Sequence, residues 1–393
     1  MTTTVVIVSA KRSPIGAFQG ILSHLKAPEI AAPVIKGLHQ TSTIAAVDEL
    51  ILGCVLSAGM GQAPARQAAI LGGLGKSLPA TTINKVCGSG MKAVMYAADM
   101  IQLGHAQSVL AGGMESMSHA PYLLLRGRAG YRMGHGDIVD HMMWDGLEDA
   151  YHSGADRTSR KAMGCFADET AKKYGFSRED QEHFSAKTFE NYQKAQQNGY
   201  FNNEIVSFPH AENVIDRDEP PMRVKVDKFS KLKPAFATDG TVTAATSSSI
   251  ADGASVLHLM SESYAQKKGY KPLARIVGYT SFACAPEWFT LAPIGAIEKI
   301  FKHIGWTSKE VDLFEINEAF AVVAMAAIKE LHLDRSKVNY HGGACTLGHP
   351  IGASGARILT TLVHALNTHG LKRGIAAACI GGGEATAMAV EMT

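Results

Sequence analysis

Two cysteines near opposite ends of the chain lie in glycine-rich segments where a thiol could do chemistry. Cys87 lies in the segment Val-Cys-Gly-Ser-Gly, between a β-leaning stretch at 80–86 and a helical pattern at 91–100. A thiol at the start of a helix lies near unpaired backbone N–H groups and the positive end of the helix dipole, and both favour the thiolate. The sequence therefore predicts that Cys87 is a nucleophile.

The second cysteine has different neighbours. Cys379 lies in an apolar run at 375–380 that is typical of a buried strand, and three glycines at 381–383 follow it. Because glycine lets a backbone approach a ligand closely, Cys379 could contact a substrate without being the first nucleophile. Either cysteine taken alone would more often be a small core residue. Core packing is the expectation for the remaining four, Cys54, Cys165, Cys284 and Cys345.

A histidine and an asparagine lie between the two cysteines in segments that favour a fixed position. His349 lies in the segment Gly-His-Pro-Ile-Gly-Ala-Ser-Gly, where the glycines allow tight packing and Pro350 fixes the backbone directly after it. Most of the 16 histidines are expected to be structural, but this segment favours a functional role for His349. Asn317 ends a strand pattern and begins the segment Asn-Glu-Ala-Phe.

The elements that must position these residues occur twice in the chain. Three short matches recur in the same order at offsets of 264, 265 and 269 residues. They are 47–53 with 311–317, 89–90 with 354–355, and 112–115 with 381–384. Each copy alternates strands and helices, which is typical of an α/β fold with a mixed sheet covered on both faces. We expect the helix after Gly88 and the helix after Gly352 to be equivalent and to pack together.

The expected organisation is two halves and an insertion. The N-terminal half spans 1–118 and is completed by 251–270, and the C-terminal half spans 271–393. Between them, residues 119–250 differ in composition. A basic stretch interrupted by glycines is followed by polar helical sequence. An insertion of this kind is often a loop domain that covers a site.

Composition limits the possible partners and compartments. The 393 residues include 38 Lys and Arg and 36 Asp and Glu, and a net charge of +2 argues against nucleic acid as a partner. No apolar run approaches the length of about 18 residues that would predict a membrane span. A strand pattern begins within the first eight residues, which predicts no leader and a cytoplasmic location. The six cysteines lack C-x-x-C spacing, so we expect neither a metal site nor disulfides.

Four segments together resemble the thiolase family. They are Val-Cys-Gly-Ser-Gly, Asn-Glu-Ala-Phe, Gly-His-Pro-Ile-Gly-Ala-Ser-Gly and Cys-Ile-Gly-Gly-Gly, in this order, and the resemblance runs from Val5 to Val390. It implies a five-layer αβαβα fold made of two duplicated halves with an inserted loop domain. Within the family the chain looks most like short-chain acetoacetyl-CoA thiolases, partly through 133–140 and 145–147. The implied reaction is a reversible Claisen condensation of two acetyl-CoA molecules to acetoacetyl-CoA and CoA.

The resemblance also implies roles for the candidate residues. Cys87 would be acylated by the thioester while His349 takes its proton. Cys379 would then remove a proton from the methyl group of a second acetyl-CoA. His349 and a water held by Asn317 would stabilise the enolate oxygen, and backbone N–H groups of Cys87 and Gly381 would stabilise the tetrahedral intermediate.

Other positions match residues that contact coenzyme A in the family. They are Ser248, Leu147, Arg223, Met163, Ala319 and Phe320. No further cofactor is implied, because acetyl-CoA, acetoacetyl-CoA and CoA are themselves the substrates and products, and the family favours a homotetramer. The chain departs from short-chain members at 162–164, 245–249 and 288–293, where we expect the aromatic side chains of Trp288 and Phe289 to limit acyl length.

Several alternatives stay open from the sequence. The enzyme could be a longer-chain degradative 3-ketoacyl-CoA thiolase or a condensing enzyme like the ketoacyl synthases. Cys379 argues against a ketoacyl synthase, because decarboxylative condensation needs no second cysteine as a base. A non-catalytic CoA- or lipid-binding relative should have lost one of the four candidate catalytic side chains, and a Cys-His-Asn peptidase is a remote option.

Overall fold

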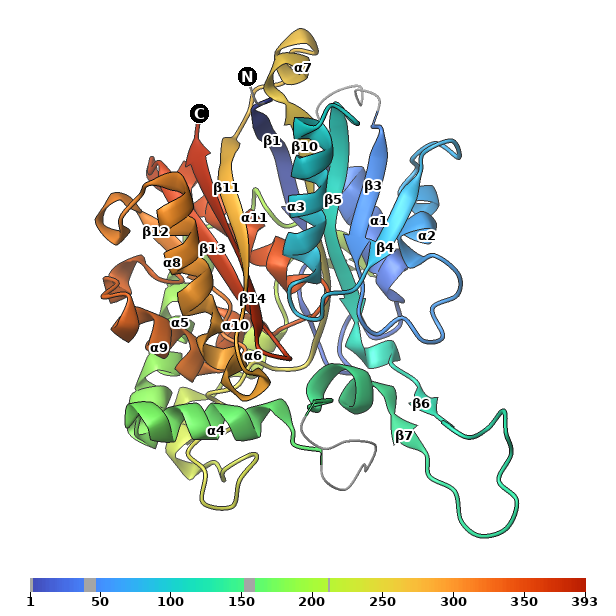
Figure 1. The fold of residues 1–393 in the computed structure, drawn as a ribbon, viewed down its shortest axis with the longest axis vertical. Helices are drawn as coiled ribbons and strands as arrows, with labels where there is room; N and C mark the ends of the chain where they lie inside the picture. Colours follow the sequence, from blue (N-terminus) through green and yellow to red (C-terminus); the bar gives the residue numbers. More distant parts are fainter. Residues whose placement is uncertain (1–2, 39–46, 152–159, 211–212) are drawn as a thin grey trace.

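The computed structural model describes residues 3–38, 47–151, 160–210 and 213–393. A ten-stranded mixed sheet has the strand order β12-β13-β14-β11-β1-β10-β5-β3-β4, with β2 paired to β10. Figure 1 shows these strands through the middle of the molecule, with helices on both sides. The strands of the first half are β1 (Val5–Arg12), β2 (Gly16–Ala17), β3 (Glu49–Gly53), β4 (Ala80–Ile83), β5 (Ser108–Ser116) and β10 (Ala251–Ser261). Those of the second half are β11 (Ala274–Ala283), β12 (Leu313–Ile316), β13 (Arg373–Ile380) and β14 (Glu384–Met392).

The two halves have the same strand arrangement. In each half the outer strands pair in parallel, β5-β3-β4 and β13-β12, and the inner strands pair antiparallel. A register shift lies between Ile7 and Ser9 in β1, and another lies between Ile276 and Gly278 in β11, at one offset of 269 residues (276 minus 7). This shared irregularity supports the predicted duplication.

The sheet register corrects one of the three sequence matches. Gly112 lies inside β5 opposite Leu52, and Ala377 lies inside β13 opposite Ile316. Gly112 therefore corresponds to Ala377, at an offset of 265 (377 minus 112). The glycines at 381–383 instead form the turn between β13 and β14. The similarity of 112–115 to 381–384 was shifted by four residues, because short glycine runs carry no register information.

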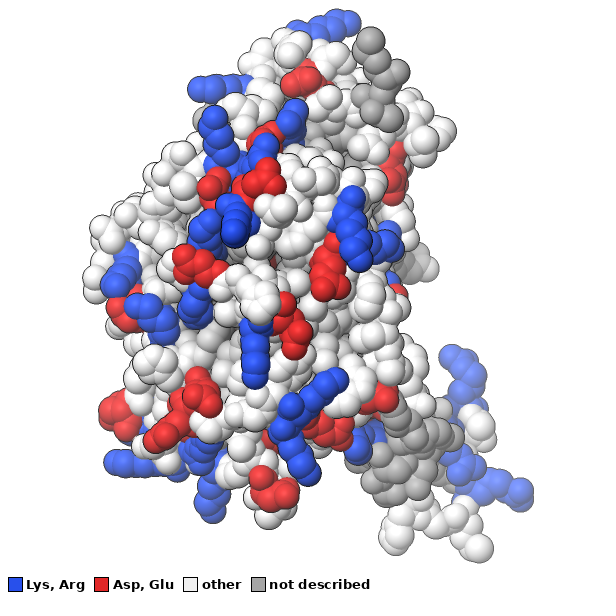
Figure 2. Space-filling view, turned by 60° about the vertical axis from the view of Figure 1, so that its left-hand side comes forward, with Lys and Arg blue, Asp and Glu red and all other residues white. Residues whose placement is uncertain are grey.

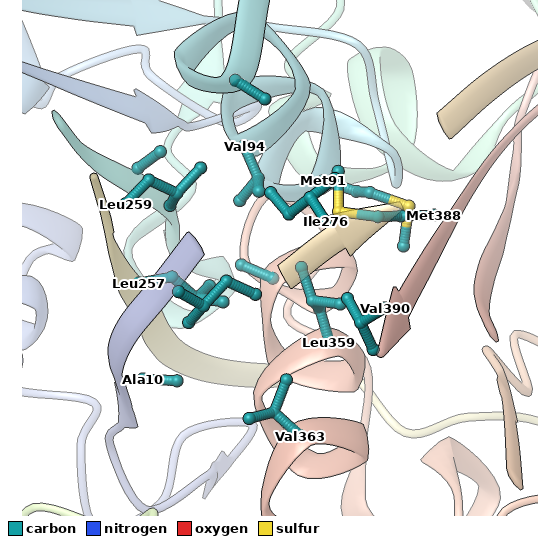
Figure 3. Packing of buried hydrophobic residues seen from close by; sticks show 14 of the residues in the cluster. Ala10, Met91, Val94, Leu257, Leu259, Ile276, Leu359, Val363, Met388 and Val390 are labelled. Atoms are coloured by element: carbon teal, nitrogen blue, oxygen red, sulfur yellow. The ribbon is translucent and has the colours of Figure 1, made fainter. Parts of the chain in front are cut away.

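A layer of two helices lies between the two halves of the sheet. These helices are α3 (Ser89–Gln102) and α11 (Ser354–His369), and their apolar side chains share one buried cluster with alternate residues of the strands. Figure 3 shows Met91 and Val94 of α3 and Leu359 and Val363 of α11 among the strand side chains. A Cβ on Gly355 would come within 2.6 Å of the backbone nitrogen of Met91, so the helix starts touch closely. The predicted contact between the two helices is confirmed.

Outer helices complete five layers. The helices α1 (Ala27–Gly37) and α2 (Pro64–Leu71) cover the outer face of the first half. The helices α8 (Ala292–Ile304) and α9 (Ala321–Glu330) cover the outer face of the second. Successive residues of β5 face opposite layers, since Val109 belongs to the central cluster and Leu110 to the outer one. The predicted αβαβα fold is confirmed.

Residues between the halves form smaller elements at one end of the sheet, at the bottom of Figure 1. They include α4 (Met163–Tyr174), α5 (Arg178–Gln197), α6 (Pro220–Arg223) and the strand pairs β6 (Tyr122–Leu123) with β7 (Val139–Asp140) and β8 (Phe208–His210) with β9 (Asn213–Ile215). Two more short helices, α7 (Glu262–Lys267) and α10 (Ala344–Leu347), lie in the later chain. Single helical turns occur at Met117–His119, Met143–Leu147, Val226–Lys231, Pro286–Leu291, Ser308–Glu310 and Arg335–Lys337.

The β6–β7 arm projects from the body of the molecule (Figure 1). We define this arm as residues 122–140. Its large apolar side chains with more than half of their surface exposed are Tyr122, Leu124, Leu125, Met133 and Ile138. In Figure 2 basic side chains stand out on the projecting lower right part, while both charge signs are interspersed over the rest of that face. An apolar stretch of this size on a projection is typical of a protein contact surface.

The central helix layer generates a test of the fold. Leu359 is fully buried between α11 and the strands, and its truncation leaves a cavity that rigid neighbours cannot fill. We expect Leu359→Ala to lower the free energy of unfolding by about 2–5 kcal/mol in a denaturant titration. The matched control is Leu103→Ala at the end of α3, where the side chain is 72% exposed and the change should stay within about 0.5 kcal/mol. Equal losses in the two variants would contradict the packing.

Candidate active site

A strained turn presents Cys87 before the first turn of α3. Val86 has φ of 45°, in the left-handed region that a β-branched residue rarely adopts. The Ser89 hydroxyl holds the turn, because it accepts from the backbone N–H of Lys85 at 2.7 Å and donates to the carbonyl of Val86 at 2.7 Å. The turn fixes the direction of the Cys87 side chain.

Burial dominates the ionisation of Cys87. It raises the pKa of this thiol to about 11, although the backbone N–H groups of Gly381 and of Cys87 itself act in the opposite direction. The negative charge of Glu115 adds to the rise. The expected net favouring of the thiolate by the helix start is therefore wrong, since desolvation outweighs the donors. A base must accept the proton when Cys87 reacts.

Cys379 lies at the end of β13 and is completely buried. Burial and the nearby Cys87 raise the pKa of the Cys379 thiol, and the N–H of Ala319 partly offsets this. Because each thiolate disfavours the other, the pair holds at most one negative charge easily. Two neighbouring thiols of this kind can exchange roles as nucleophile and proton carrier.

His349 is held in one tautomer. Its Nδ1 lies 2.5 Å from the hydroxyl of Ser354, and that hydroxyl donates its proton to the carbonyl of Pro350 at 2.9 Å. The hydroxyl can then only accept from Nδ1–H, which leaves Nε2 with a free lone pair. Burial, and secondly the charge of Arg357, lower the pKa of His349 to about 3. The ring is thus a neutral base with Nε2 available.

Asn317 lies against the imidazole ring. Its Nδ2 is 3.5 Å from both ring nitrogens of His349, so it does not point along the Nε2 lone pair. Its backbone N–H donates to Ala377 at 2.9 Å, which ties the end of β12 to β13. The buried Oδ1 has no hydrogen-bond partner among the described residues. Buried amide oxygens need a donor, so this atom is suited to fix a water or a substrate group.

Glu318 supports this arrangement, although the sequence gave it no separate role. Its carboxylate accepts from Thr188 at 2.9 Å, from Asn339 at 2.6 Å and from the N–H of Cys345 at 3.2 Å. These bonds connect the turn after β12 to α5 and to the segment that leads to His349. Its partners are far away in the sequence, and only the unusual placement of a carboxylate in an apolar segment could have indicated it.

The candidate ligand-contacting residues divide into two groups. Near the thiols, a Cβ on Gly381 would lie 3.1 Å from the Met163 sulfur, and Leu147 packs with Cys87 in one apolar cluster. Ala319 and Phe320 are buried in the turn between β12 and α9. Ser248 binds the carbonyl of Ala319 through its N–H and its hydroxyl, both at 3.0 Å. Ser248 thus connects this first group to its neighbours Ser247 and Ser249, which line the pocket of the second group.

Arg223 lines a pocket of about 310 Å³ that also contains Lys225, Lys228, Ser247 and Ser249. Arg223 also forms an ion pair with Glu219. Three cationic side chains and two neighbouring hydroxyls suit a phosphate-bearing ligand. The Ser249 carbonyl accepts from the N–H of His349 at 3.0 Å, so this pocket is directly linked to the histidine.

The two aromatic residues expected to limit acyl length lie in the turn at Pro286–Leu291. Trp288 lies beneath the Lys173 ammonium group, 4.1 Å from the ring centre. Phe289 packs edge-on against Phe166 and Phe320 and is buried in the outer cluster of the second half. Met163 therefore contacts the Gly381 turn more directly than either aromatic residue.

The described part of the chain has neither a cluster of metal-ligating side chains nor a membrane-spanning helix. In residues 3–38, 47–151, 160–210 and 213–393, no group of three or more His, Cys, Asp and Glu could hold a metal ion. Within the same ranges, no helix is long and apolar enough to cross a membrane.

Comparisons with known proteins agree with this geometry. Residues 5–263 match the thiolase N-terminal domain and 270–392 match the thiolase C-terminal domain. The chain is 47% identical to a probable acetyl-CoA acetyltransferase of Dictyostelium discoideum, over 99% of this chain and 94% of that protein. It is 46% identical to the acetyl-CoA acetyltransferase of Allochromatium vinosum, over the whole of both chains.

Two solved structures have the same fold. The acetyl-CoA acetyltransferase of Bacillus anthracis superposes with a TM-score of 0.94 at 40% identity, covering 100% of this chain and 99% of that one. The Acat5 thiolase of Ascaris suum in complex with coenzyme A superposes with a TM-score of 0.92 at 40% identity, covering 99% of this chain and 100% of that one.

The surroundings of the thiols predict their reactivity. We expect iodoacetamide at pH 7 to alkylate Cys87 before Cys379 and Cys54, because those two thiols are buried and burial raises the pKa of both. The rate at Cys87 should rise about tenfold per pH unit from 7 to 9, since this range lies below its pKa. Peptide mass spectrometry measures both effects. Earlier labelling of Cys379, or a plateau near pH 8, would contradict the assigned environments.

Proposed function

Because the chain belongs to the thiolase family, we propose that it is an acetyl-CoA C-acetyltransferase that condenses two acetyl-CoA molecules to acetoacetyl-CoA and CoA, or catalyses the reverse thiolysis. The observations that carry this proposal are the pairing of the Cys87 and Cys379 thiols beside backbone N–H donors, and a buried, neutral His349 that lies against Asn317. Such a reaction needs a nucleophile that carries the acetyl group, a second base that deprotonates the other acetyl-CoA, and hydrogen-bond donors for each oxyanion.

In the first half-reaction, Cys87 attacks the carbonyl carbon of acetyl-CoA. His349 Nε2 takes the thiol proton as the new S–C bond forms, and the same proton then goes to the departing CoA thiolate. The low pKa of His349 keeps the ring neutral and able to accept. The N–H groups of Cys87 and Gly381, which face the Cys87 sulfur, are suited to bind the oxyanion.

In the second half-reaction, His349 Nε2 takes the proton of the Cys379 thiol, and the Cys379 thiolate removes a proton from the methyl group of a second acetyl-CoA. The carbanion attacks the acetyl group on Cys87, so a carbon–carbon bond forms while the S–C bond to Cys87 breaks. The methyl proton on Cys379 then passes to the Cys87 thiolate, and His349 returns its proton to Cys379. The enolate oxygen would be stabilised from His349 and from a water at the free Oδ1 of Asn317.

Coenzyme A would lie along the two groups of ligand-contacting residues. Arg223, with Lys225 and Lys228, would bind the phosphates at the outer pocket. Ser248, Leu147, Ala319 and Phe320 would line the path of the pantetheine, and Met163 would close the acyl end beside Gly381. The complex of Ascaris suum Acat5 with coenzyme A supports this kind of ligand.

The assembly and location are also proposals. Exposed apolar side chains on the β6–β7 arm support assembly with further copies of the chain, and we propose a homotetramer. We further propose a cytoplasmic role in the metabolism of fatty acids and related thioesters. The substrates are soluble thioesters, which suits this setting.

The other classes fit the observations less well. A ketoacyl synthase-like enzyme gives Cys379 no function, and a non-catalytic binding protein would not need to keep both thiols, His349 and Asn317 together. A Cys-His-Asn peptidase does not need the second thiol either. Longer-chain 3-ketoacyl-CoA thiolysis is the alternative that shares every catalytic group, and chain-length measurements distinguish it.

The separate role of Cys379 is directly testable. We expect Cys379→Ser to keep acetylation of Cys87, measured by exchange of labelled CoA into acetyl-CoA, while formation of acetoacetyl-CoA falls at least about 10²-fold. Serine is too weakly acidic to cycle as the base. The control is Cys284→Ser, whose thiol only contacts the carbonyls of Gly383 and Trp288. Equal loss of both half-reactions would mean that Cys379 only maintains the site.

Acyl length should depend on Met163. We expect the wild-type kcat/KM for thiolysis to fall from four-carbon to six-carbon 3-ketoacyl-CoA. Met163→Ala should recover part of the loss, because each methylene that a pocket accommodates contributes about 0.8 kcal/mol. Met392→Ala, at the far end of β14, is the matched control. A wild-type profile that rises from four to eight carbons would favour the longer-chain alternative.

A further inference from the structure

Glu115 is a buried carboxylate that the mechanism above does not use. It lies on β5 and is fully buried. Val109 and Ala111, on the same face of this strand, belong to the central helix cluster, so Glu115 also faces the layer of α3 and α11. It lies at the end of that layer where both helices begin. An ionisable side chain in this position needs strong partners.

The partners of Glu115 come from both halves of the protein. One oxygen, Oε2, accepts from the N–H of Val55 at 3.0 Å and from the N–H of Gly352 at 2.9 Å. The other oxygen accepts from the N–H of Leu56 at 3.1 Å and contacts the Cys54 sulfur at 3.8 Å. These N–H donors lower the pKa of the Glu115 carboxyl, but burial outweighs them and raises it to about 7. The carboxylate therefore links the loop after β3 to the loop that follows His349.

The backbone packing around Gly352 leaves this link little freedom. A Cβ on Gly352 would lie 2.7 Å from Oε2 of Glu115 and 2.8 Å from the carbonyl oxygen of Met114. A Cβ on Gly113 would overlap the carbonyl oxygen of Gly352. The Gly352 peptide is thus enclosed on several sides by the first half. A shift of Glu115 would have to move the whole loop.

This loop connects directly to the catalytic groups. Gly352 lies three residues after His349 and two before Ser354, whose hydroxyl fixes the His349 tautomer. On the other side, Val55 and Leu56 pack with Ile351 and Cys87 in one apolar cluster. The carboxylate therefore lies between the residues that pack with Cys87 and the loop that positions His349.

The duplicated fold shows what is special at this position. At the offset of 265 residues that relates β5 to β13, Glu115 corresponds to Ile380. Ile380 reaches the equivalent loop of the other half, because a Cβ on Gly88 would contact its side chain. The fold can therefore fill this position with an apolar side chain. A carboxylate stands only on the side where a loop must be held by hydrogen bonds.

We propose that Glu115 is a positioning residue for the acetyl transfer, which holds the His349 loop at a fixed distance from Cys87. This inference rests on the proposed function. Removing the carboxylate has two effects of opposite sign. Above the pKa of Glu115 the Cys87 thiol becomes easier to ionise, and the transfer that depends on His349 becomes slower.

The test uses Glu115→Gln in the full-length protein. We expect KM for acetyl-CoA to stay within about twofold while kcat for CoA exchange falls about 10²-fold, the effect of a displacement of about 1 Å at the reacting groups. Alkylation of Cys87 by iodoacetamide at pH 9, where Glu115 is ionised, should become several-fold faster in the variant, because the negative charge near the thiol is gone. The matched control is Glu49→Gln on β3, whose carboxylate binds the Thr81 hydroxyl near the surface and should change neither rate.

Each result decides the proposal. A folded Gln variant with unchanged kcat, or with slower alkylation of Cys87, would overturn it. If the variant does not fold, hydrogen exchange of the wild-type protein decides: the amides of Val55, Leu56 and Gly352 should exchange together, and independent exchange of Gly352 would refute the link. A wild-type protein without acetyl transfer would overturn the proposed function, while the alkylation rates would still report whether Glu115 acts on Cys87.

Discussion

The contact between α3 and α11 is the constraint on which the rest of the structure depends. Each helix begins directly after a loop that carries one catalytic candidate, Cys87 or His349. The glycines near the two helix starts let the backbones touch, and this contact brings together residues 262 positions apart (349 minus 87). The sheets on either side bury the apolar faces of both helices. A change in the distance between the helices would therefore appear directly as a change in the distance between nucleophile and base.

Burial has opposite effects on the reacting groups, and together they define the chemistry. It raises the pKa of both thiols and lowers that of His349, so these three groups are uncharged at neutral pH. Charge develops only when a thioester is present to receive it. Between pH 6.5 and about 3, His349 in the unfolded protein binds a proton that His349 in the folded protein does not. This histidine therefore makes the folded state less stable as the pH falls.

Much of the fold and the central site could be predicted from the sequence, because glycine and proline carry strong local information. The duplication, the central helix pair and the segments of Cys87, Cys379, His349 and Asn317 all came from such patterns. The direction of the Cys87 pKa did not, since desolvation depends on the surrounding layers. Glu115, Glu318 and Ser354 were given no role, because their partners are distant or lie on the backbone.

The left-handed conformation of Val86 has a consequence for how this protein can be improved. A β-branched residue in that region costs on the order of 1–3 kcal/mol, and glycine would adopt it without strain. A selection for heat resistance alone would thus favour glycine at this position. The same replacement would loosen the turn that aims the thiol. At Val86, the backbone angle that lowers thermal stability also places the Cys87 side chain. A stabilised enzyme should therefore gain its stability from changes elsewhere in the chain.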